Sequence, residues 1–555
     1  MKMTGARAII EVLLEQGVDT VFGYPGGSVL NIYDALYQYG GKINHILTAH
    51  EQGAAHAADG YARVTGKTGV VIATSGPGAT NLVTGIANAY MDSIPLVAIT
   101  GNVPVPSLGR DSFQEIDITG VTMPITKHNF IVKDINDLVP TLRAAFKIAS
   151  SGRKGPVLVD VTKDVTGAET EYTPAPPVKP LETKPAKMSA LERAAEIIKE
   201  AKKPLFYIGG GLISSNASPE LLKLAEKVQI PVTSSMMGLG GFPYDNPLYM
   251  GLIGMHGRFV ANKAAHDCDV LITAGARFSD RVAGNRAMFA PNAKIIHIDI
   301  DPAEMDKNVF SHCHVRGDLK QVLGALYDML PEANHDQWIK ELSEIKKPYK
   351  RVDFEGYVNP MDIITTIDKL TPDDTIIATD VGQHQLWAAQ YYNFRLPRTL
   401  VTSGGLGTMG FGLGAAIGAQ MGQKDKQVVL ITGDGSFHMN LNEMTTLASY
   451  NIPVVIVLMN NEVLGMVRQW QTVFYGKRYS QTDPHRKTDF VKLAEAFGIN
   501  GMKIEKPEDI EPVIKKALDL HGPVLIDCRI AHDASVLPMI PPGGAVQDTI
   551  DEMCY

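Results

Sequence analysis

Two polar side chains of this sequence stand where they could bind a divalent metal ion together. Asp434 follows the apolar run VVLITG, and Asn461 follows a second run, VVIVLMN. Between the runs, Leu441, Met444 and Leu447 recur at helical spacing, which predicts a strand–helix–strand unit whose two strand ends share one sheet edge. A carboxylate and an amide oxygen suit Mg²⁺, which takes its remaining ligands from water and phosphate.

The turn around this carboxylate offers a place for an anion beside the metal. Gly433, Gly435 and Ser436 put backbone N–H groups at a predicted helix start, where an anionic group is favoured. Together with a metal at Asp434 and Asn461, the turn predicts a diphosphate held through the ion. A lone GDG turn would indicate only a solvated aspartate, and here the second strand with its paired asparagines favours the metal site.

The composition is that of an ordinary globular enzyme. The chain has 555 residues, of which 45% are hydrophobic and 20% charged, and three domains are a natural expectation for this length. A net charge of −8 argues against nucleic acid or an anionic membrane as the main partner. No apolar run reaches the length of a membrane span, and the amphipathic N-terminus does not have the pattern of a signal sequence. Because Cys268, Cys313, Cys528 and Cys554 form no CxxC pair, we expect a reducing, cytoplasmic location.

Three blocks of alternating strand and helix patterns divide the chain. We expect domains at residues 1–165, 188–340 and 357–535, followed by a loop-like tail or lid at residues 536–555. The stretch ETEYTPAPPVKPLETKPAK, between the first two blocks, is rich in proline and charged residues and predicts a linker. Alternating strands and helices in every block predict an α/β protein with three doubly wound parallel sheets.

The GDG…NN pattern resembles the thiamine diphosphate (ThDP) motif of the superfamily that contains pyruvate oxidase and acetohydroxyacid synthase, and further likenesses run through nearly the whole chain. The resemblance implies that the three blocks are a pyrimidine-binding domain, a central FAD-binding-type domain and a diphosphate-binding domain. It also implies a third metal ligand, the main-chain carbonyl near Val463. Beyond the GDG turn, the implied ThDP contacts are Gly26 and Gly27 of YPGG, Pro77 of SGPG, Gln383 and His384 of VGQHQ, and Gly407 and Met409 of SGGLGTMG.

Glu51 is the carboxylate that the resemblance assigns to activation of the coenzyme. It follows an apolar strand and begins the alanine-rich helix predicted from EQGAAHAADGYARV. By the resemblance, Glu51 pairs with N1′ of the aminopyrimidine, and Met409 holds the coenzyme bent so that its amino group meets C2. By position alone, Glu51 would be an acidic residue favoured at a helix N-terminus, and Met409 would be core filler.

The central block contains segments that are similar to those of acetohydroxyacid synthases and imply bound FAD. GARFSDRV resembles the family segment GxRFDDRVTG, and GMHG resembles another. The strand IIHIDID ends in acidic residues that could meet a ribose hydroxyl. The implied FAD contacts are Arg153, Gly210, Gly211, His256, Arg277, Asp299 and Asp318.

The segment LGMVRQW is also similar to that family and implies a pocket for a second substrate. Trp470 would line this pocket and favour 2-oxobutanoate over pyruvate, and Arg281 would bind the substrate carboxylate through its guanidinium group. Phe113, Gln114 and Lys127 match further residues of the family's catalytic pocket. Without the flanking likeness, Trp470 could equally anchor a core and Arg281 could form a surface ion pair.

As a whole, the resemblance implies the catalytic large subunit of an acetohydroxyacid synthase. Such a transferase uses ThDP, Mg²⁺ and FAD, decarboxylates pyruvate and ligates the hydroxyethyl unit to pyruvate or 2-oxobutanoate, the first step of branched-chain amino-acid synthesis. The family also implies a homodimer or tetramer with its active site at the dimer interface, and a possible separate small regulatory subunit. The alternatives are an FAD-independent catabolic acetolactate synthase, a pyruvate-oxidase-like ThDP enzyme and a non-catalytic relative.

Overall fold

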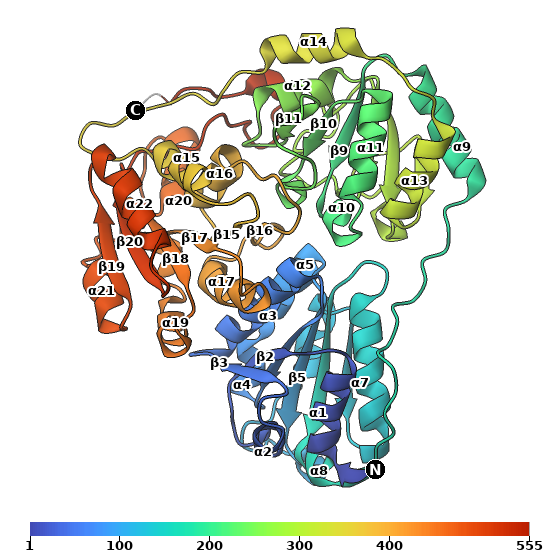
Figure 1. The fold of residues 1–555 in the computed structure, drawn as a ribbon, viewed down its shortest axis with the longest axis vertical. Helices are drawn as coiled ribbons and strands as arrows, with labels where there is room; N and C mark the ends of the chain where they lie inside the picture. The colour runs from blue at the N-terminus through green and yellow to red at the C-terminus, as the bar shows by residue number, and fades with distance from the viewer. Residues whose placement is uncertain (554–555) are drawn as a thin grey trace.

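The computed structural model describes residues 1–553, which form three α/β units, each built on a six-stranded parallel sheet (Figure 1). The predicted fold class is therefore confirmed. Cys268, Cys313 and Cys528 are buried free thiols, and Cys554 lies outside the described residues. Within residues 1–553, no helix is both long and apolar enough to cross a membrane.

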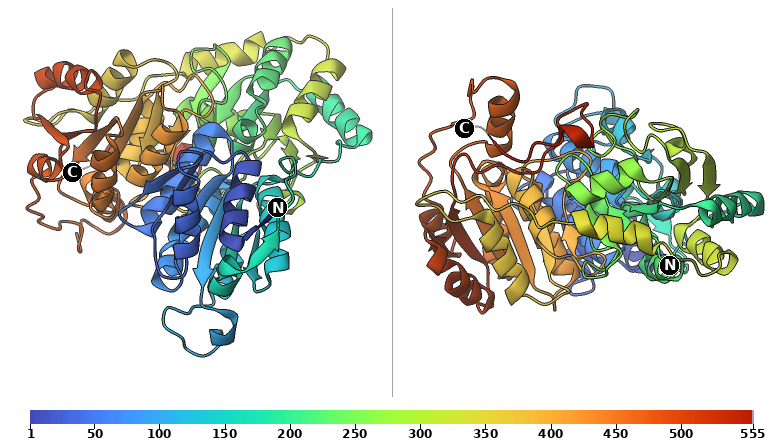
Figure 2. Two further views of the ribbon diagram at one scale, coloured as in Figure 1. Left: turned by 60° about the horizontal axis from the view of Figure 1, so that its bottom comes forward. Right: turned by 90° about the horizontal axis from the view of Figure 1, so that it is seen from above.

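The first unit has the strand order β3-β2-β4-β5-β7-β6, with every neighbouring pair parallel. Its strands are β2 (Thr20–Gly23), β3 (Asn44–Leu47), β4 (Gly69–Ala73), β5 (Leu96–Asn102), β6 (His128–Val132) and β7 (Pro156–Thr162). Its helices are α1 (Gly5–Glu15), α2 (Leu30–Gln38), α3 (Glu51–Thr65), α4 (Pro77–Asn81), α5 (Val83–Asp92), α6 (Ile118–Thr122), α7 (Ile135–Ser150) and α8 (Lys163–Gly167). The loop between β5 and α6 projects from the body of this unit (Figure 2, left).

The central unit has the order β11-β10-β9-β12-β13-β14, again with parallel pairs throughout. Its strands are β9 (Pro204–Ile208), β10 (Val232–Ser234), β11 (Tyr249–Leu252), β12 (Val270–Ala274), β13 (Lys294–Asp299) and β14 (Cys313–Arg316). Its helices are α9 (Met188–Glu200), α10 (Gly210–Ser214), α11 (Ser218–Val228), α12 (Phe259–Asp267), α13 (Leu319–Met329) and α14 (Asp336–Ile345).

The third unit has the order β16-β15-β17-β18-β20-β19 and is parallel throughout. Its strands are β15 (Ile376–Thr379), β16 (Leu400–Val401), β17 (Val428–Gly433), β18 (Val454–Asn460), β19 (Asn500–Ile504) and β20 (Val524–Arg529). Its helices are α15 (Pro360–Leu370), α16 (Gln383–Tyr391), α17 (Phe411–Gly422), α18 (Asp434–Phe437), α19 (Met444–Tyr450), α20 (Gly465–Phe474), α21 (Phe490–Ala496) and α22 (Ile510–Leu518).

The segment predicted as a linker is not structureless from its first residue. β8 (Glu169–Glu171) pairs antiparallel with β1 (Lys2–Thr4), so the first unit continues beyond the boundary expected at residue 165. Residues 172–187 contain no helix or strand. The tail returns to the central unit, where the Ile540 N–H donates to the carbonyl of Met255 at 2.8 Å.

One hydrophobic core runs from the first unit into the third, along the contact between α3 and α17 (Figure 1). The two helices are rich in alanine and glycine at this contact, which lets their backbones approach closely. A Cβ atom at Gly418 would lie 1.7 Å from the carbonyl oxygen of Ala57, and one at Gly60 would lie 2.1 Å from that of Ala415. The first and third units are therefore joined by a contact that only glycine permits at these two positions.

Candidate active site

The two predicted metal ligands lie next to each other at one edge of the third sheet. β17 and β18 are parallel neighbours, and their register pairs Gly433 with Met459. Asp434 therefore begins α18 beside Asn461, in the arrangement that the two apolar runs predict. Both side chains are buried. Burial raises the pKa of Asp434 to about 7, so its ionised form is costly until a cation lies beside it.

Three oxygen atoms converge here at distances that suit a coordinated cation. Oδ1 of Asn461 lies 3.2 Å from Oδ1 of Asp434 and 2.9 Å from the carbonyl oxygen of Val463. Octahedral Mg²⁺, with bonds of about 2.1 Å, sets neighbouring ligand oxygens about 3.0 Å apart, so the attraction of each oxygen to a cation would offset their mutual repulsion. Within residues 1–553 no group of three His, Cys, Asp or Glu side chains is arranged as a metal site. One carboxylate and two neutral oxygens leave coordination positions for phosphate and water.

Gln383 fixes the orientation of the Asn461 amide. Its Oε1 accepts from Nδ2 of Asn461 at 3.2 Å, while its Nε2 donates to Oε1 of Gln469 at 3.0 Å and to the carbonyl of Ala534 at 2.7 Å. A reversed Asn461 amide would set its oxygen against Oε1 of Gln383, so the observed network keeps that oxygen on the cation side. The family resemblance places Gln383 on the diphosphate, but in the structure its amide contacts Asn461, a candidate metal ligand. Gly465 leaves room for this contact, since a Cβ there would lie 2.0 Å from Oε1 of Gln383.

His384 lies against the GDG turn. A Cβ atom at Gly433 would be 2.6 Å from its Nδ1. Burial lowers the pKa of His384 to about 3, so the imidazole is neutral, and across residues 1–553 its Nε2 finds no hydrogen-bond partner. An unpaired buried ring nitrogen beside this turn fits a site where a ligand supplies the missing partner. Cε of Met409 lies 3.8 Å from the Cβ position of Gly435, whereas the hydroxyl of Ser436 is already used, donating to the carbonyl of Val381 at 2.6 Å.

Glu51 belongs to a second group of site residues, in the first unit. It begins α3, capped by the His50 side chain, and is buried. Nδ2 of Asn81 donates to Oε2 of Glu51 at 2.9 Å, and a Cβ at Gly78 would lie 3.2 Å from Oε1. The short helix α4, which starts at Pro77, therefore supplies both neighbours of the carboxylate. Asn81 was not predicted from the sequence, although its place in the same GPGATN segment as Pro77 was a usable signal.

Two further candidate residues, Gln114 and Gly26, lie against the segment that contains the SGPG turn. A Cβ at Gly76 would be 2.9 Å from Cα of Gln114, and the neighbouring Phe113 side chain is 87% exposed. Gly26 packs on Thr74, because a Cβ at Gly26 would be 2.4 Å from the Thr74 side chain. The first unit thus brings together the residues predicted at its YPGG, SGPG and DSFQE segments. The next residue, Gly27, is exposed, and no atom lies within 4 Å of its Cβ position.

Lys127 lies away from this group. It precedes β6, at the amino edge of the first sheet, whereas Glu51 follows the carboxyl end of β3. Its Nζ donates to the carbonyls of Ile148 at 2.5 Å and Ser151 at 2.6 Å, at the C-terminal end of α7. Burial lowers the pKa of Lys127 to about 8. Within one chain, Lys127 therefore caps a helix and does not meet Glu51.

The two groups are also separate from each other within one chain. Across residues 1–553, no hydrogen bond or ion pair joins Glu51 to Asp434, Asn461 or Gln383. The residues predicted to bind the second substrate, however, come together from different units. The guanidinium carbon of Arg281 lies 5.8 Å from the centre of a Trp470 ring, and the Arg281 side chain is 63% exposed.

The glycine and aspartate residues predicted to contact FAD follow the carboxyl ends of three of four neighbouring strands of the central sheet. They are Gly210 and Gly211 after β9, Asp299 at the end of β13 and Asp318 after β14. Gly275, which was not predicted as a contact, follows the fourth strand, β12. A Cβ at Gly211 would be 2.7 Å from Cα of Gly275, so backbones meet closely at this edge. Burial raises the pKa of Asp299 to about 6.

The remaining FAD candidates are His256 and two arginines. His256 is buried, and within residues 1–553 its Nδ1 has no hydrogen-bond partner. Nη2 of Arg277 donates to the carbonyl of Met91 at 2.8 Å. Arg153 donates to Ser93 at 2.9 Å and forms ion pairs with Asp301 at 3.1 Å and Glu304 at 2.7 Å. Both arginines thus contact the C-terminal end of α5.

Comparison with known proteins places this arrangement in a family. The chain matches the thiamine pyrophosphate enzyme family in three parts: its N-terminal TPP binding domain over residues 3–121, its central domain over residues 191–326 and its C-terminal TPP binding domain over residues 380–528. The acetolactate synthase large subunit of Corynebacterium glutamicum is 47% identical, over 99% of this chain and 90% of that protein. That of Parasynechococcus marenigrum is 46% identical over 98% and 90%. The acetolactate synthase isozyme 2 large subunit of Escherichia coli is 45% identical over 99% and 100%.

Proposed function

Because this chain belongs to the acetolactate synthase large subunits of the thiamine pyrophosphate enzyme family, we propose how its own residues carry out the synthesis of acetolactate. When bound, thiamine diphosphate supplies the nucleophilic carbon and the electron sink for decarboxylation of pyruvate and transfer of its two-carbon unit to a second 2-oxoacid. Asp434, Asn461 and the carbonyl of Val463 would hold Mg²⁺, whose charge would offset that of the diphosphate. The observation that carries this assignment is that Oδ1 of Asn461 lies 2.9 Å from the carbonyl oxygen of Val463 and 3.2 Å from Oδ1 of Asp434.

Other side chains position the coenzyme and exchange protons with it. The neutral His384 would lie beside the diphosphate at the GDG turn, and Met409 would support the coenzyme from beside Gly435. Glu51 would hold a proton at its carboxyl group beside the aminopyrimidine ring. Its Oε2 is held by Asn81, and its Oε1 is left to face the ring.

We assign the acceptor subsite to Arg281 and Trp470. The guanidinium group binds the carboxylate of pyruvate or 2-oxobutanoate, and the indole ring lines the pocket for the alkyl group. Phe113 and Gln114 complete this pocket from the first unit. The contact between Arg281 and Trp470 across two units supports this assignment.

The active site is completed by a second copy of the chain in this proposal. The support is that Glu51 has no link to the metal group of its own chain, and that the neighbouring Phe113 is largely exposed. A homodimer, or a tetramer built from it, would set Glu51 and Phe113 of one copy against Asp434 of the other. Lys127 remains a candidate for the pocket only through such a partner. The naming of the relatives as large subunits supports a separate small regulatory subunit. A cytoplasmic location stays a prediction.

FAD is the cofactor we propose for the central unit. The support is the glycine contact at the carboxyl edge of the sheet, together with the half-buried Asp299 and, within residues 1–553, the unpaired Nδ1 of His256. Flavin absorbance of the purified protein tests this directly. A colourless protein with full activity would favour the FAD-independent form.

Product analysis tests the function as a whole. The purified protein is given pyruvate and 2-oxobutanoate in competition, with and without added ThDP, Mg²⁺ and FAD. We expect acetolactate and acetohydroxybutanoate, with formation of both dependent on ThDP and Mg²⁺. Oxygen or quinone reduction without acetolactate would instead identify an oxidase.

A further inference from the structure

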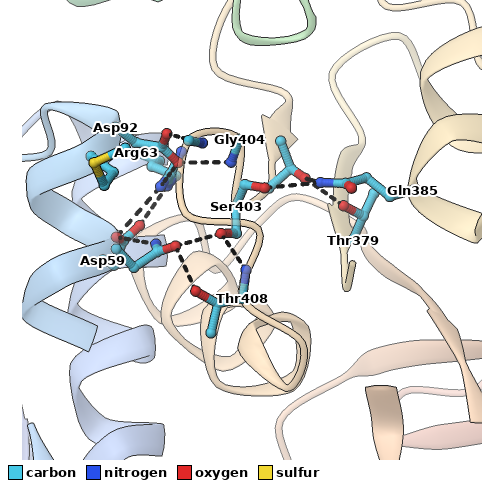
Figure 3. A network of polar contacts seen from close by, with 12 residues as sticks. Asp59, Arg63, Asp92, Thr379, Gln385, Ser403, Gly404 and Thr408 are labelled. Carbon is cyan, nitrogen blue, oxygen red and sulfur yellow. Dashed lines mark hydrogen bonds and ion pairs between the residues drawn. The ribbon is translucent and has the colours of Figure 1, made fainter. Parts of the chain in front are cut away.

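A cluster of buried charges lies where the first unit meets the third (Figure 3). The Arg63 guanidinium forms ion pairs with Asp59 at 2.5 Å and with Asp92 at 2.9 Å. The side chains of both aspartates are 0% exposed and that of Arg63 is 5% exposed. Two buried carboxylates share one buried guanidinium, so the cluster carries an excess negative charge that other hydrogen-bond donors must offset.

Those donors come from the third unit. Oδ2 and Oδ1 of Asp92 accept from the backbone N–H groups of Gly404 at 2.9 Å and Gly405 at 2.7 Å. Both oxygens of Asp92 are therefore engaged with a loop of another unit, and Oδ2 also accepts from Arg63. Asp92 is the last residue of α5, far from the loop in the sequence, and these hydrogen bonds connect the two.

Asn88, one turn earlier in α5, makes a second link to the same loop. Its Nδ2 donates to Asp59 at 3.0 Å, which fixes the direction of the amide. Its Oδ1 accepts from the hydroxyl of Ser403 at 2.5 Å and from that of Thr408 at 3.3 Å. The Ser403 hydroxyl in turn accepts from the Thr408 N–H at 2.9 Å, so both ends of the loop are tied to one side chain (Figure 3).

The loop needs such external support because its own sequence, SGGLGTMG, contains four glycines in eight residues. Glycine loses more conformational freedom on ordering than any other residue, so an unanchored loop of this composition would sample many conformations. Residues 404–407 are exposed, and packing on the loop itself does not hold them. The loop leads directly to Met409, whose Cε lies beside the GDG turn.

We propose that Asp92, supported by Asn88, is a positioning residue that clamps the 403–408 loop in the conformation that receives the coenzyme. The proposal rests on the proposed function, because the loop matters to catalysis only if Met409 supports ThDP. The first unit therefore positions a loop of the third unit in its own chain. In the proposed dimer, the same unit also contributes Glu51 to the active site of the partner. No contact between Asp92 and substrate, metal or coenzyme is involved.

The test compares Asp92→Asn with wild type in the full-length protein. The variant keeps the size of the side chain, but its amide can accept only one of the two loop N–H groups and turns its own NH₂ toward the other donors. In coenzyme-free protein, we expect faster hydrogen exchange at the amides of residues 404–408. The ThDP concentration for half-maximal activity should rise roughly tenfold, because apparent affinity falls with the fraction of loops in the competent conformation. At saturating ThDP, kcat should stay within about twofold of wild type.

Two further variants guard against a general loss of structure. Ser403→Ala removes the shorter of the two hydrogen bonds from the loop to Asn88 and leaves the charged cluster whole. It should therefore raise the half-saturating ThDP concentration by a smaller factor, and it replaces Asp92→Asn if that variant does not fold. Gln423→Ala is the matched control: it removes a 3.3 Å hydrogen bond to the carbonyl of Val64 that joins the same two units away from the loop. This control should leave both readouts at their wild-type values.

Unchanged loop exchange and an unchanged ThDP requirement in Asp92→Asn would overturn the proposal. So would an equal ThDP shift in Gln423→Ala, because the effect would then come from the interface in general. A wild-type protein that does not bind ThDP would refute the proposed function, and the exchange measurement would still decide whether Asp92 clamps the loop.

Discussion

The orientation of Asn461 by Gln383 leads to a prediction about metal affinity. In Gln383→Leu, the Asn461 amide loses the acceptor that holds its Nδ2 at 3.2 Å. The amide can then rotate and turn its NH₂ group toward the cation position. Loss of one such hydrogen bond is worth about 1 kcal/mol, and substitution of residues that orient metal ligands costs roughly 10- to 100-fold in affinity. We expect the half-saturating Mg²⁺ concentration to rise roughly tenfold.

The same substitution also has a cost that does not involve the metal. The carbonyl of Ala534, which accepts from Gln383 at 2.7 Å, loses this donor in a buried site, at a cost of about 1 to 3 kcal/mol in unfolding free energy. Gln390→Leu is the matched control, because Gln390 lies on the same helix, is buried and donates to the carbonyls of His256 at 2.8 Å and Leu537 at 3.3 Å. It should lower stability by a similar amount and leave the Mg²⁺ requirement unchanged.

The assay measures initial rates of acetolactate formation against free Mg²⁺ at saturating ThDP, with calorimetric titration of Mg²⁺ as a direct check. Urea midpoints of all three proteins report the stability cost. If Gln383→Leu loses stability as Gln390→Leu does and keeps a wild-type Mg²⁺ titration, Gln383 does not orient the metal ligand. A selective loss of ThDP affinity, with Mg²⁺ binding intact, would indicate that Gln383 contacts the diphosphate, as the family resemblance implies.

Three other predictions follow from single contacts or single groups. Glu51→Gln should lower kcat by roughly 10²- to 10⁴-fold while ThDP binding by calorimetry stays within a few-fold, since proton exchange is lost and the shape is kept. Gly418→Ala should lower the free energy of unfolding in urea by about 3 kcal/mol or more, because its Cβ would lie 1.7 Å from the Ala57 carbonyl oxygen. Gly324→Ala, whose Cβ position has no atom within 4 Å, should instead raise it by about 0.5 to 1 kcal/mol. Burial raises the pKa of Asp160 to about 7 from 3.8, so the folded chain holds a proton that the unfolded chain releases, and stability falls as pH rises between these values. Asp160→Asn should remove up to roughly 4 kcal/mol of this decline, as seen in urea midpoints measured from pH 4.5 to 7.5.

The interior strands of all three sheets were predictable from the sequence, and most edge strands were not. The inner strands β4, β5, β17 and β18 are covered on both faces by helices, so their sequences are continuous apolar runs. All of the strands of the three sheets that were not predicted from the sequence lie at sheet edges: β6, β11, β14, β16 and β19. At an edge one side of the strand is unpaired, and in β6, β14 and β19 exposed residues interrupt the apolar pattern.

For the site, too, residues placed by the strand pattern could be predicted from the sequence, whereas contacts between distant segments could not. Asp434 and Asn461 could be paired from sequence because adjacent parallel strands bring their carboxyl ends to one edge, a consequence of topology alone. The role of Gln383 was not accessible, since its contacts to Asn461 and Ala534 depend on how three segments pack. The link from Asp92 to the loop carried no signal in the sequence, because Gly404 and Gly405 lie more than 300 positions away.

The contact between α3 and α17 connects the two halves of this chemistry within one chain. α3 begins with Glu51, and α17 begins at Phe411, two residues after Met409. The helices run side by side with pairs such as Ala57 and Gly418 in backbone contact. Helices that touch through backbone atoms cannot rotate or slide as helices separated by long side chains can, because no side chain can change rotamer to absorb the movement. Within one chain, the distance between Glu51 and Met409 is therefore set by glycine and alanine residues that take no part in the reaction. A substitution in this contact should disturb coenzyme binding and proton exchange together, which separates it from changes at Gln383 or Glu51 that affect one function each.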